Sequence, residues 1–368
     1  MEAAQPFKKT PLLEEHLALG AKIAPFAGWQ MPIQYEGILS EALYTRHAAT
    51  CFDICHMGEF LIKGDAHKSG LETIVSANLD NLAIGSCRYS SMLNEEGGII
   101  DDLIIYRKAQ EEWMIVVNAG TIEKDKQHFL KHLSKNAEFN DLSEILGKID
   151  LQGPESENII KMIAPEIRPL EYYTFTTTGI LGEKNIISRT GYTGEMGFEI
   201  YASIDKIKTV WKTLLKTKNV KPAGLGARDV LRLEMGYSLY GQDIDETTSP
   251  LEAGLEKFIS LDKEFIGKQA LARQKKEGLK KHRVFLKTTT RRAPRHLYNI
   301  YHDGLCVGTV TSGSFSPHLE QGIGIGFTEI PLDNLTKTIH VGEDKTKIES
   351  FFCTKPFIKQ TSLKNKMR

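Results

Sequence analysis

The sequence predicts an α+β protein whose C-terminal part is a small all-β domain. Short alternating segments over 87–118, joined by tight polar turns, precede an amphipathic helix over 122–134, an order typical of α+β folds. A similar set recurs over 145–215. After His282, six short β-rich segments with Gly and Pro turns indicate a small β-barrel or sandwich. The 368 residues exceed the roughly 250–300 that one core supports, so two or three domains are expected.

Composition argues against several kinds of partner. The chain has 47 basic and 47 acidic residues, so no global field favours nucleic acid or an anionic membrane. Its five cysteines form no Cys-x-x-Cys motif and no His pair has zinc spacing, so we expect neither a disulfide framework nor a metal site. The chain shows no apolar run of 18 residues and no signal-like N-terminus, which favours a cytoplasmic protein.

The N-terminal part begins with an irregular apolar segment over 11–34 and continues with helical spacing over 36–50. His56 and Met57 then lie at the junction before a predicted strand over 60–63. A lone His at such a junction is more often a hydrogen-bonded structural residue than a ligand. Asp65 is expected to cap a helix that runs through Asn78.

The stretch over 94–105 carries the strongest chemical signal. Its Glu-Glu-Gly-Gly sequence is typical of a hairpin turn between strands over 87–93 and 99–106. Because side chains alternate between the two faces of a strand, Asp101 and Asp102 cannot both point outward, and one must face the packed side. A carboxylate there is costly unless it is paired or used. The alternative is structural, with one Asp capping the turn and the inward acid paired with an Arg.

A second candidate is the segment over 191–199. Three glycines around Tyr192 allow the backbone to approach a ligand closely, but the segment lacks the Gly-Lys-Ser/Thr of a phosphate loop. Glu199 alternates with Phe198 and Ile200, so it faces away from them. The alternative for Glu199 is an exposed strand residue on the wet face of a sheet.

A third candidate is Arg228, in the first turn of a Gly-led helix over 222–234. Arg228 and Arg232 share a face of this helix at i,i+4 spacing. An Arg in such an apolar helix is suited to a bidentate contact with a carboxylate, which can belong to a ligand or to the protein itself.

The lysines over 275–281 are read as a solvated helix end. The predicted β segments that follow are 284–287, 298–302, 307–311, 322–328, 337–341 and 345–352.

Several motifs, taken in their order, resemble the aminomethyltransferase (T-protein) family of the glycine cleavage system, from Lys9 to Phe357. Each motif is weak alone, and the order makes the set specific. The motifs are Thr10-Pro11-Leu12, Phe26-Ala27-Gly28-Trp29-Gln30-Met31-Pro32, His56-Met57-Gly58-Glu59, Gly97-Gly98-Ile99-Ile100-Asp101-Asp102-Leu103, Gly191-Tyr192-Thr193-Gly194-Glu195, Gly226-Ala227-Arg228-Asp229, Tyr240-Gly241-Gln242-Asp243-Ile244 and Gly308-Thr309-Val310-Thr311-Ser312-Gly313.

The resemblance implies three domains around a central channel: two intertwined α+β subdomains with antiparallel sheets, and a C-terminal β-barrel. We expect boundaries of 1–260 for the folate-binding region, 261–281 for a helical linker and 282–362 for the barrel. The implied reaction takes the one-carbon unit from aminomethyl-dihydrolipoyl H-protein to the co-substrate tetrahydrofolate, releases ammonia and gives 5,10-methylenetetrahydrofolate. The alternatives are a folate-dependent demethylase of a small methylated compound and a folate-binding protein without turnover.

The resemblance also assigns site residues. It makes Asp102 the catalytic carboxylate and implies that it stabilises a positively charged one-carbon unit and orients the folate amine. The residues expected to bind folate are Met57, Tyr89, Asn118, Tyr192, Glu199 and Arg228. Two departures stand out: family members usually have Ser at Cys55, and many have Tyr where this chain has 359–362, so a folate contact of the tail is not carried over. An acidic lipoyl carrier would need a local basic surface, for which the candidates are the basic residues over 275–283 and Arg291, Arg292 and Arg295.

Overall fold

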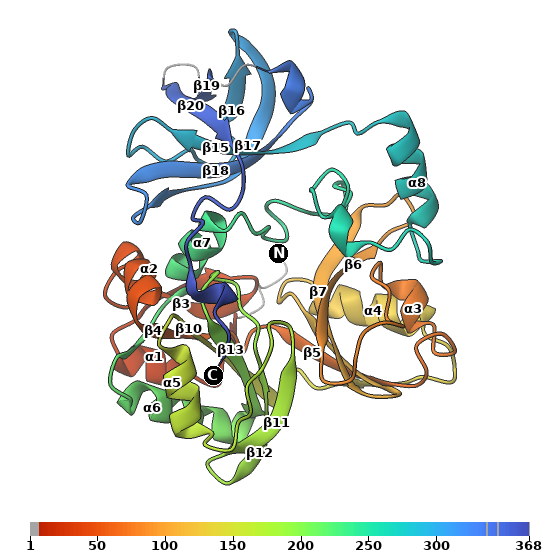
Figure 1. Ribbon diagram of the computed structural model, residues 1–368, viewed down its shortest axis with the longest axis vertical. Helices are drawn as coiled ribbons and strands as arrows, with labels where there is room; N and C mark the ends of the chain where they lie inside the picture. Colours follow the sequence, from red (N-terminus) through yellow and green to blue (C-terminus); the bar gives the residue numbers. More distant parts are fainter. Residues whose placement is uncertain (1–6, 336–337, 344–345, 368) are drawn as a thin grey trace, which may run out of the picture.

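The computed structural model of the protein describes residues 7–335, 338–343 and 346–367. Figure 1 shows three bodies: a β-barrel at the top and two sheet-and-helix bodies below it. The first described elements are β1 (Lys8–Lys9), α1 (Leu13–Ala18), β2 (Lys22–Phe26), β3 (Trp29–Gln34) and α2 (Ile38–His47). Strands β1, β3 and β2 form a small sheet in that order. Within the described residues no helix is long and apolar enough to span a membrane.

The first body is a five-stranded antiparallel sheet in the order β6-β7-β8-β5-β9. Its strands are β5 (Gly58–Lys63), β6 (Cys87–Leu93), β7 (Ile99–Ala109), β8 (Glu112–Val117) and β9 (Glu138–Asp141). Helices α3 (Leu71–Ile74) and α4 (Ile122–His132) cover one face, where Phe129 packs with Phe60 and Ile115. The predicted hairpin is confirmed, because β6 pairs with β7 across the turn that precedes Ile99.

The second body is a six-stranded mixed sheet in the order β11-β12-β13-β10-β4-β14. Its strands are β4 (Ala49–Asp53), β10 (Leu146–Gln152), β11 (Phe175–Ile180), β12 (Glu183–Ser188), β13 (Gly197–Ser203) and β14 (Val220–Pro222). Helices α5 (Ser156–Ile163) and α6 (Ile204–Lys216) pack on one face, where Trp211 meets Ile149 and Phe198. The chain enters this sheet at β4, leaves for the first body and returns at β10, so the two α+β bodies are intertwined as expected.

The third body is a closed barrel in the order β15-β18-β17-β16-β19-β20. Helix α7 (Leu225–Glu234), the short η1 (Glu256–Phe258) and α8 (Lys268–Glu277) lead into it. Its strands are β15 (His282–Thr288), β16 (Asn299–His302), β17 (Leu305–Ser316), β18 (Gln321–Thr328), β19 (Thr338–Gly342) and β20 (Ile348–Cys353), with η2 (Leu332–Asn334) between β18 and β19 and η3 (Ser362–Lys364) in the tail. The sequence predicted a barrel or a sandwich for the C-terminal strands, and the structure shows a closed barrel. The predicted strand starts at Lys337 and Lys345 lie outside the described residues.

Some local predictions were wrong. The expected helix over 65–78 is only the four-residue α3. Asp65 instead stabilises a turn, because its Oδ1 accepts from the backbone N–H groups of His67 and Lys68. Residues 49 and 50, at the end of the predicted helical spacing, open β4 instead.

Candidate active site

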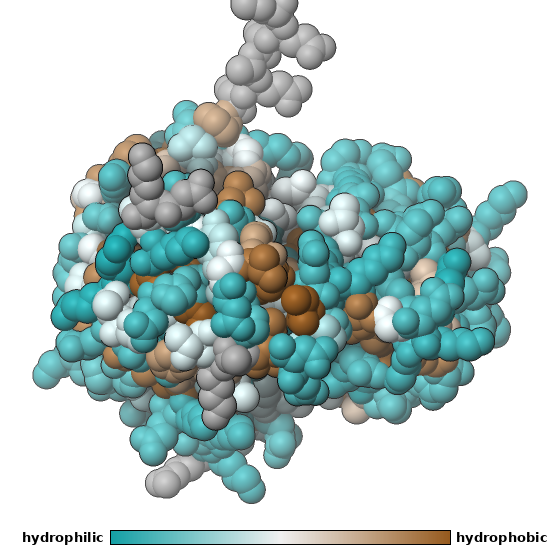
Figure 2. Space-filling model, turned by 90° about the horizontal axis from the view of Figure 1, so that it is seen from above, coloured by the Kyte–Doolittle hydropathy of each residue, from teal (hydrophilic) through white to brown (hydrophobic). Residues whose placement is uncertain are grey.

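A cavity of about 1580 Å³ is lined by residues of both α+β bodies, helix α7, the barrel and the C-terminal tail. Figure 2 shows the molecule from the barrel end, with apolar side chains gathered near the middle of this face and hydrophilic ones around them. All seven residues selected from the sequence line the cavity: Met57, Tyr89, Asp102, Asn118, Tyr192, Glu199 and Arg228. Their roles remain predictions, but segments far apart in the sequence do meet at one place.

Strand β7 presents its two acids to opposite sides. Asp101 is fully buried, and Asp102 is half-buried and lines the cavity. Asn118 joins them: its Nδ2 donates to Asp101 Oδ1 at 2.8 Å and to Asp102 Oδ1 at 2.9 Å, and its backbone N–H donates to Asp101 Oδ2 at 3.0 Å. Tyr89 donates from its hydroxyl to the other oxygen of Asp102, Oδ2, at 3.0 Å. Both oxygens of the Asp102 carboxyl are therefore held in a fixed orientation.

The Asp102 carboxyl titrates near neutral pH. Burial raises its pKa to about 7, and the adjacent Asp101 adds to the rise against the hydrogen bonds from Tyr89 and Asn118. The pKa of Asp101 is raised well above its usual range, first by burial and then by Asp125. With its pKa near 7, Asp102 can both hold and release a proton at neutral pH.

A second polar group of the cavity surrounds Glu199 on β13. Its Oε2 lies 3.3 Å from Lys148 Nζ and accepts from the hydroxyls of Tyr106 at 3.2 Å and Tyr201 at 3.3 Å. Burial alone would raise the pKa of Glu199, but Lys148 and Arg228 hold it below its usual value. Glu199 is therefore an ionised acceptor that lines the cavity, and it is not the exposed strand residue of the alternative interpretation.

Arg228 has a protein partner and also faces the cavity. Its Nη1 donates to Asp150 Oδ2 on β10, so the internal pairing that the sequence left open does occur. The guanidinium also lies over the ring of Tyr192, with its central carbon 4.8 Å from the ring centroid. Tyr192 in turn stacks on Tyr237, with centroids 5.8 Å apart and an interplanar angle of 22°. These rings give the cavity a flat aromatic wall.

The glycines around Tyr192 make room for neighbouring side chains, and the expected close approach of their backbone to a ligand stays a prediction. An added Cβ at Gly191 or Gly197 would lie within 2.3 Å or 2.1 Å of the Gln152 side chain, so both glycines make room for Gln152. Gly194 adopts φ +78°, a conformation that favours glycine. Gly191 lines the cavity, but the packing of Gln152 already accounts for the absence of a side chain there.

Two polar residues that line the cavity, Lys148 and His56, and one that supports its wall, Asp150, were not selected from the sequence. Lys148 faces the cavity from β10, and Asp150 supports Arg228 from the same strand. Lys148 and Asp150 are two residues apart in an otherwise apolar strand, so both charges lie on one face. This spacing could have identified them from the sequence. His56 is 5% exposed, lines the cavity and packs edge-on against Phe26, and its Nδ1 has no hydrogen-bond partner among the residues that the structure describes. Burial lowers the pKa of His56 to about 4, so its imidazole is neutral.

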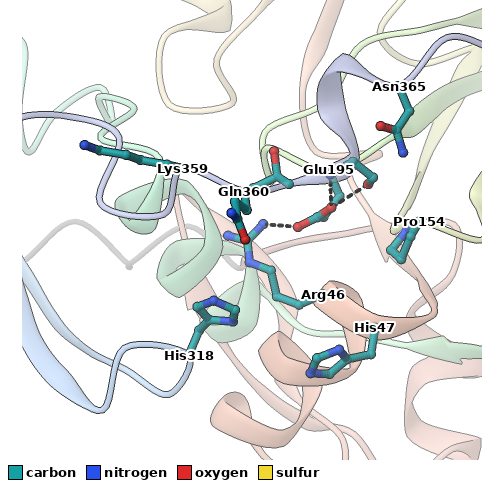
Figure 3. Close-up of a pocket in the computed structure, with 10 residues that line it drawn as sticks. Arg46, His47, Pro154, Glu195, His318, Lys359, Gln360 and Asn365 are labelled. Atoms are coloured by element: carbon teal, nitrogen blue, oxygen red, sulfur yellow. Dashed lines mark hydrogen bonds and ion pairs between the residues drawn. The ribbon is translucent and has the colours of Figure 1, made fainter.

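The C-terminal tail also lines the cavity, although no contact was carried over to it. Its Lys359 and Thr361 line both this cavity and a smaller pocket of about 430 Å³ on the outside. Figure 3 shows the tail passing over the ion pair between Arg46 and Glu195 in the smaller pocket. The backbone N–H of Ser362 donates to Glu195 Oε2 at 2.8 Å, which anchors the tail there. The tail is thus a fixed wall between the two spaces.

The chemistry that this cavity offers follows from its lining. It presents nine Lys and Arg but only three Asp and Glu, so it is electropositive although the chain has no net charge. Among the described residues no cluster of His, Cys, Asp or Glu could hold a metal ion. Glu199 can accept hydrogen bonds from a donor-rich heterocycle, the tyrosines can pack against its faces, and Asp102 can exchange a proton with an amine.

Comparison with known proteins identifies relatives along nearly the whole chain. Residues 12–263 match the GCVT N-terminal domain family, and residues 281–359 match the glycine cleavage T-protein C-terminal barrel domain family. An aminomethyltransferase of Pseudothermotoga lettingae is 43% identical over 354 residues, 95% of this chain and 98% of the relative. One of Halothermothrix orenii is 45% identical over 325 residues, 87% of this chain and 91% of the relative. The crystal structure of glycine cleavage system aminomethyltransferase T from Bartonella henselae has a TM-score of 0.90 at 33% identity and covers 96% of this chain and 99% of that one.

Proposed function

Since the chain belongs to the glycine cleavage T-protein family of aminomethyltransferases, we propose that its central cavity binds tetrahydrofolate and receives the aminomethyl group there. The observation that carries this assignment is the arrangement of Asp102. A carboxyl with a pKa near 7 lines a large cavity and is held by Tyr89 and Asn118, within a lining that suits a pterin. The product would be 5,10-methylenetetrahydrofolate, with release of ammonia.

The lining fits tetrahydrofolate in both its polar and its aromatic character. A pterin has a donor-rich amino-pyrimidinone edge, and the ionised Glu199 is an acceptor for that edge. Lys148 and the Arg228–Asp150 pair hold Glu199 and its surroundings in place. Tyr192 supplies a flat apolar surface for a ring system. The volume of about 1580 Å³ leaves room for a donor group beside the folate.

Asp102 has two roles in the proposed mechanism. When bound, tetrahydrofolate supplies the nitrogen atoms that accept the one-carbon unit. Ionised Asp102 stabilises positive charge at the reacting carbon and orients the accepting amine, because Tyr89 and Asn118 fix both of its oxygens. With a pKa near 7, Asp102 can also pass a proton toward the departing amine. Tyr89 and Asn118 are positioning residues for this carboxyl.

The proposed donor is an aminomethyl group on the lipoyl arm of H-protein, and the docking surface needs one correction. Arg283 is not available to a partner, because it is 9% exposed and donates to Ser238 Oγ and to the backbone oxygens of Ala253 and Gly236. The exposed residues Arg292 and Arg295 remain candidates. The segment that carries them contacts β17 through His296, whose Nδ1 lies 2.7 Å from the Thr311 carbonyl oxygen.

The deciding experiment measures methylenetetrahydrofolate formed from aminomethyl-loaded H-protein and tetrahydrofolate. The proposal expects turnover that requires both partners. Release of a one-carbon unit from a small methylated amine, with no response to H-protein, would identify a demethylase instead. Tight folate binding without product from either donor would identify a binding protein. Asp102→Asn is the variant that links any turnover to the proposed carboxylate.

A further inference from the structure

We propose that Tyr240, in the loop over 240–248 between α7 and η1, is a positioning residue of the reaction: it holds a β-bulge in β7 that turns Asp102 rather than Asp101 toward the cavity. The inference rests on the proposed function for the role of Asp102, and it adds the contacts that aim this carboxyl. It starts from the two adjacent acids of β7, of which Asp102 lines the cavity and Asp101 does not.

The bulge lies immediately before the two acids. In the pairing of β6 with β7, Leu93 is opposite Ile99, but the neighbouring Met92 is opposite Asp101. Ile100 is therefore an extra residue of β7 that has no counterpart on β6. Such a bulge bends its strand and changes the direction of the side chains that follow it.

The bulge determines which acid reaches the cavity. Regular alternation would place Ile99 and Asp101 on the same face of β7. Instead, Ile99 belongs to an apolar cluster against which Tyr89 packs, and Tyr89 is a donor to Asp102. The extra residue Ile100 packs into the core that α3 and α4 cover. A strand that kept Ile99 in place without the bulge would therefore present Asp101 to the cavity.

The loop over 240–248 holds the bulge through the backbone of Ile99. The N–H of Ile99 donates to the carbonyl oxygens of Asp245 at 3.0 Å and Thr248 at 3.1 Å. The carbonyl oxygen of Ile99 accepts from the Tyr240 hydroxyl at 3.3 Å. Both polar groups of this residue are thus bound by one loop, which fixes the strand at the point where its register changes.

Two further contacts fix the loop and its tyrosine. Lys124 of α4 donates from Nζ to the Tyr240 hydroxyl at 2.9 Å and to Glu246 Oε1 at 2.6 Å. Because the hydroxyl accepts from Lys124, its own proton is available to the carbonyl oxygen of Ile99. The carbonyl oxygen of Glu246 occupies the place of a Cβ on Gly98, so the residue before Ile99 must be glycine for the loop to approach.

A loosened bulge would misdirect the reacting carboxyl. Tyr89 and Asn118 donate to Asp102, and these hydrogen bonds stabilise its ionised form. Movement of the strand at Ile99 would shift Asp102 relative to both donors, so the ionised form would lose part of this stabilisation. Loss of the Tyr240 hydroxyl should therefore lower kcat and move the rising limb of the pH–rate profile to higher pH.

The test measures turnover, its pH dependence and folate affinity in Tyr240→Phe and in Lys124→Met, since Lys124 does not line the cavity. Tyr240→Phe should lower kcat about three- to tenfold and move the limb up by about half a pH unit, the scale of one hydrogen bond. Lys124→Met should act in the same direction but more weakly, and Lys124→Arg, which keeps a donor, should stay close to the natural chain. Folate affinity should not change. Thermal unfolding checks that each variant is folded.

The matched control is Lys126→Met. Lys126 lies on the same helix and also forms an ion pair, but its partner is Asp141 of β9, at 3.1 Å. This variant should keep the natural kcat and pH–rate profile. An equal change in Lys124→Met and Lys126→Met would show a general effect of charge on α4 and would overturn the inference.

The Asp102→Asn background separates positioning from direct contact with a ligand, because Tyr240 itself lines the cavity. If Tyr240 acts through Asp102, Tyr240→Phe should cause no further loss in the residual turnover of Asp102→Asn. An equal loss in both backgrounds overturns the inference. Weaker folate binding by Tyr240→Phe with an unmoved pH limb also overturns it and identifies a ligand contact instead.

One measurement does not require turnover and so separates this inference from the proposed function. NMR titration of the Asp102 carboxyl, assigned by the signal that Asp102→Asn lacks, should give a midpoint about half a pH unit higher in Tyr240→Phe than in the natural chain. An unchanged midpoint overturns the positioning role. If the midpoint moves but the natural chain forms no methylenetetrahydrofolate, the proposed function fails and the control of Asp102 by Tyr240 stands.

Discussion

Replacement of Asp102 by Asn is expected to make the protein more stable and far less active. The natural carboxyl has a pKa of about 7 in the folded chain, against an ordinary value of 3.8. This rise corresponds to roughly 4 kcal/mol at neutral pH, by which ionisation of the carboxyl disfavours folding. Asp102 is only half-buried and faces the cavity, so solvent reduces this penalty. We expect a stabilisation of about 1–3 kcal/mol in the Asn variant.

Because the pKa of Asp102 is raised in the folded chain, the stability gained by Asp102→Asn depends on pH. Below pH 4 the carboxyl is protonated in both the folded and unfolded chains, so the Asn variant has no advantage. Between about pH 4 and pH 7 only the unfolded chain ionises, so the advantage of the variant grows, and it is complete above pH 7. Turnover should fall by about 10² to 10³-fold, the scale of losing one preorganised electrostatic group. In the natural chain, turnover should rise through pH 7 as Asp102 ionises.

Two measurements test this reasoning. Unfolding by denaturant at pH 5 and pH 8 gives the stability difference, and product formation gives turnover. Asp101→Asn is the matched variant on the opposite face of β7. It should lose less activity, and it should gain no stability, because both Asp101 oxygens accept from Asn118 and an amide would oppose those donors. Near-normal turnover of Asp102→Asn would refute its catalytic role. An equal stability difference at both pH values would refute the ionisation argument.

Three further predictions concern binding, positioning and docking. Glu199→Ala should raise the KM for folate rather than lower kcat. Arg228→Ala should raise this KM and also destabilise the fold, because it leaves the buried Asp150 without its cationic partner. Calorimetry measures the loss of folate affinity, and denaturant unfolding measures the loss of stability. Tyr89→Phe removes a donor to the reacting carboxylate, so the rising limb of the pH–rate profile should move to higher pH; an unmoved limb would contradict the positioning role. Reversal of Arg292 and Arg295 to Glu should slow the reaction with H-protein and reduce its salt sensitivity but spare free aminomethyl-dihydrolipoate; equal loss with both donors would indicate a damaged folate site.

The sequence predicted most of the architecture because local patterns carry it. Alternation and turn residues gave the β6–β7 hairpin, and the family resemblance gave the intertwined bodies and the barrel, both of which are confirmed. The failures are also local: the helix expected after Asp65 is a turn followed by four helical residues, because the Asp65 side chain bonds the backbone of that turn. The domain boundaries stay predictions.

The site was harder to predict because its electrostatics arise between elements distant in sequence. The sequence left open whether Arg228 meets a ligand or an internal acid, and Arg228 pairs with Asp150 while still facing the cavity. The pKa of Asp102 depends first on its burial and then on Asp101, Tyr89 and Asn118, and no sequence spacing reveals this burial. The burial of Arg283 likewise depends on its contacts with Ser238, Ala253 and Gly236, which precede the barrel in the chain.

Helix α7 explains how these distant parts are kept in register. Near its start, Arg228 contacts Asp150 of the six-stranded sheet. One turn later, Arg232 donates to Ser312 of the barrel at 2.8 Å. At its end, Glu234 accepts from Arg46 of α2 at 2.7 Å and from the hydroxyl of the barrel residue Ser316 at 2.6 Å. One rigid helix therefore couples the barrel position to the cavity wall, so a substitution in the barrel can displace a cavity residue without touching a ligand.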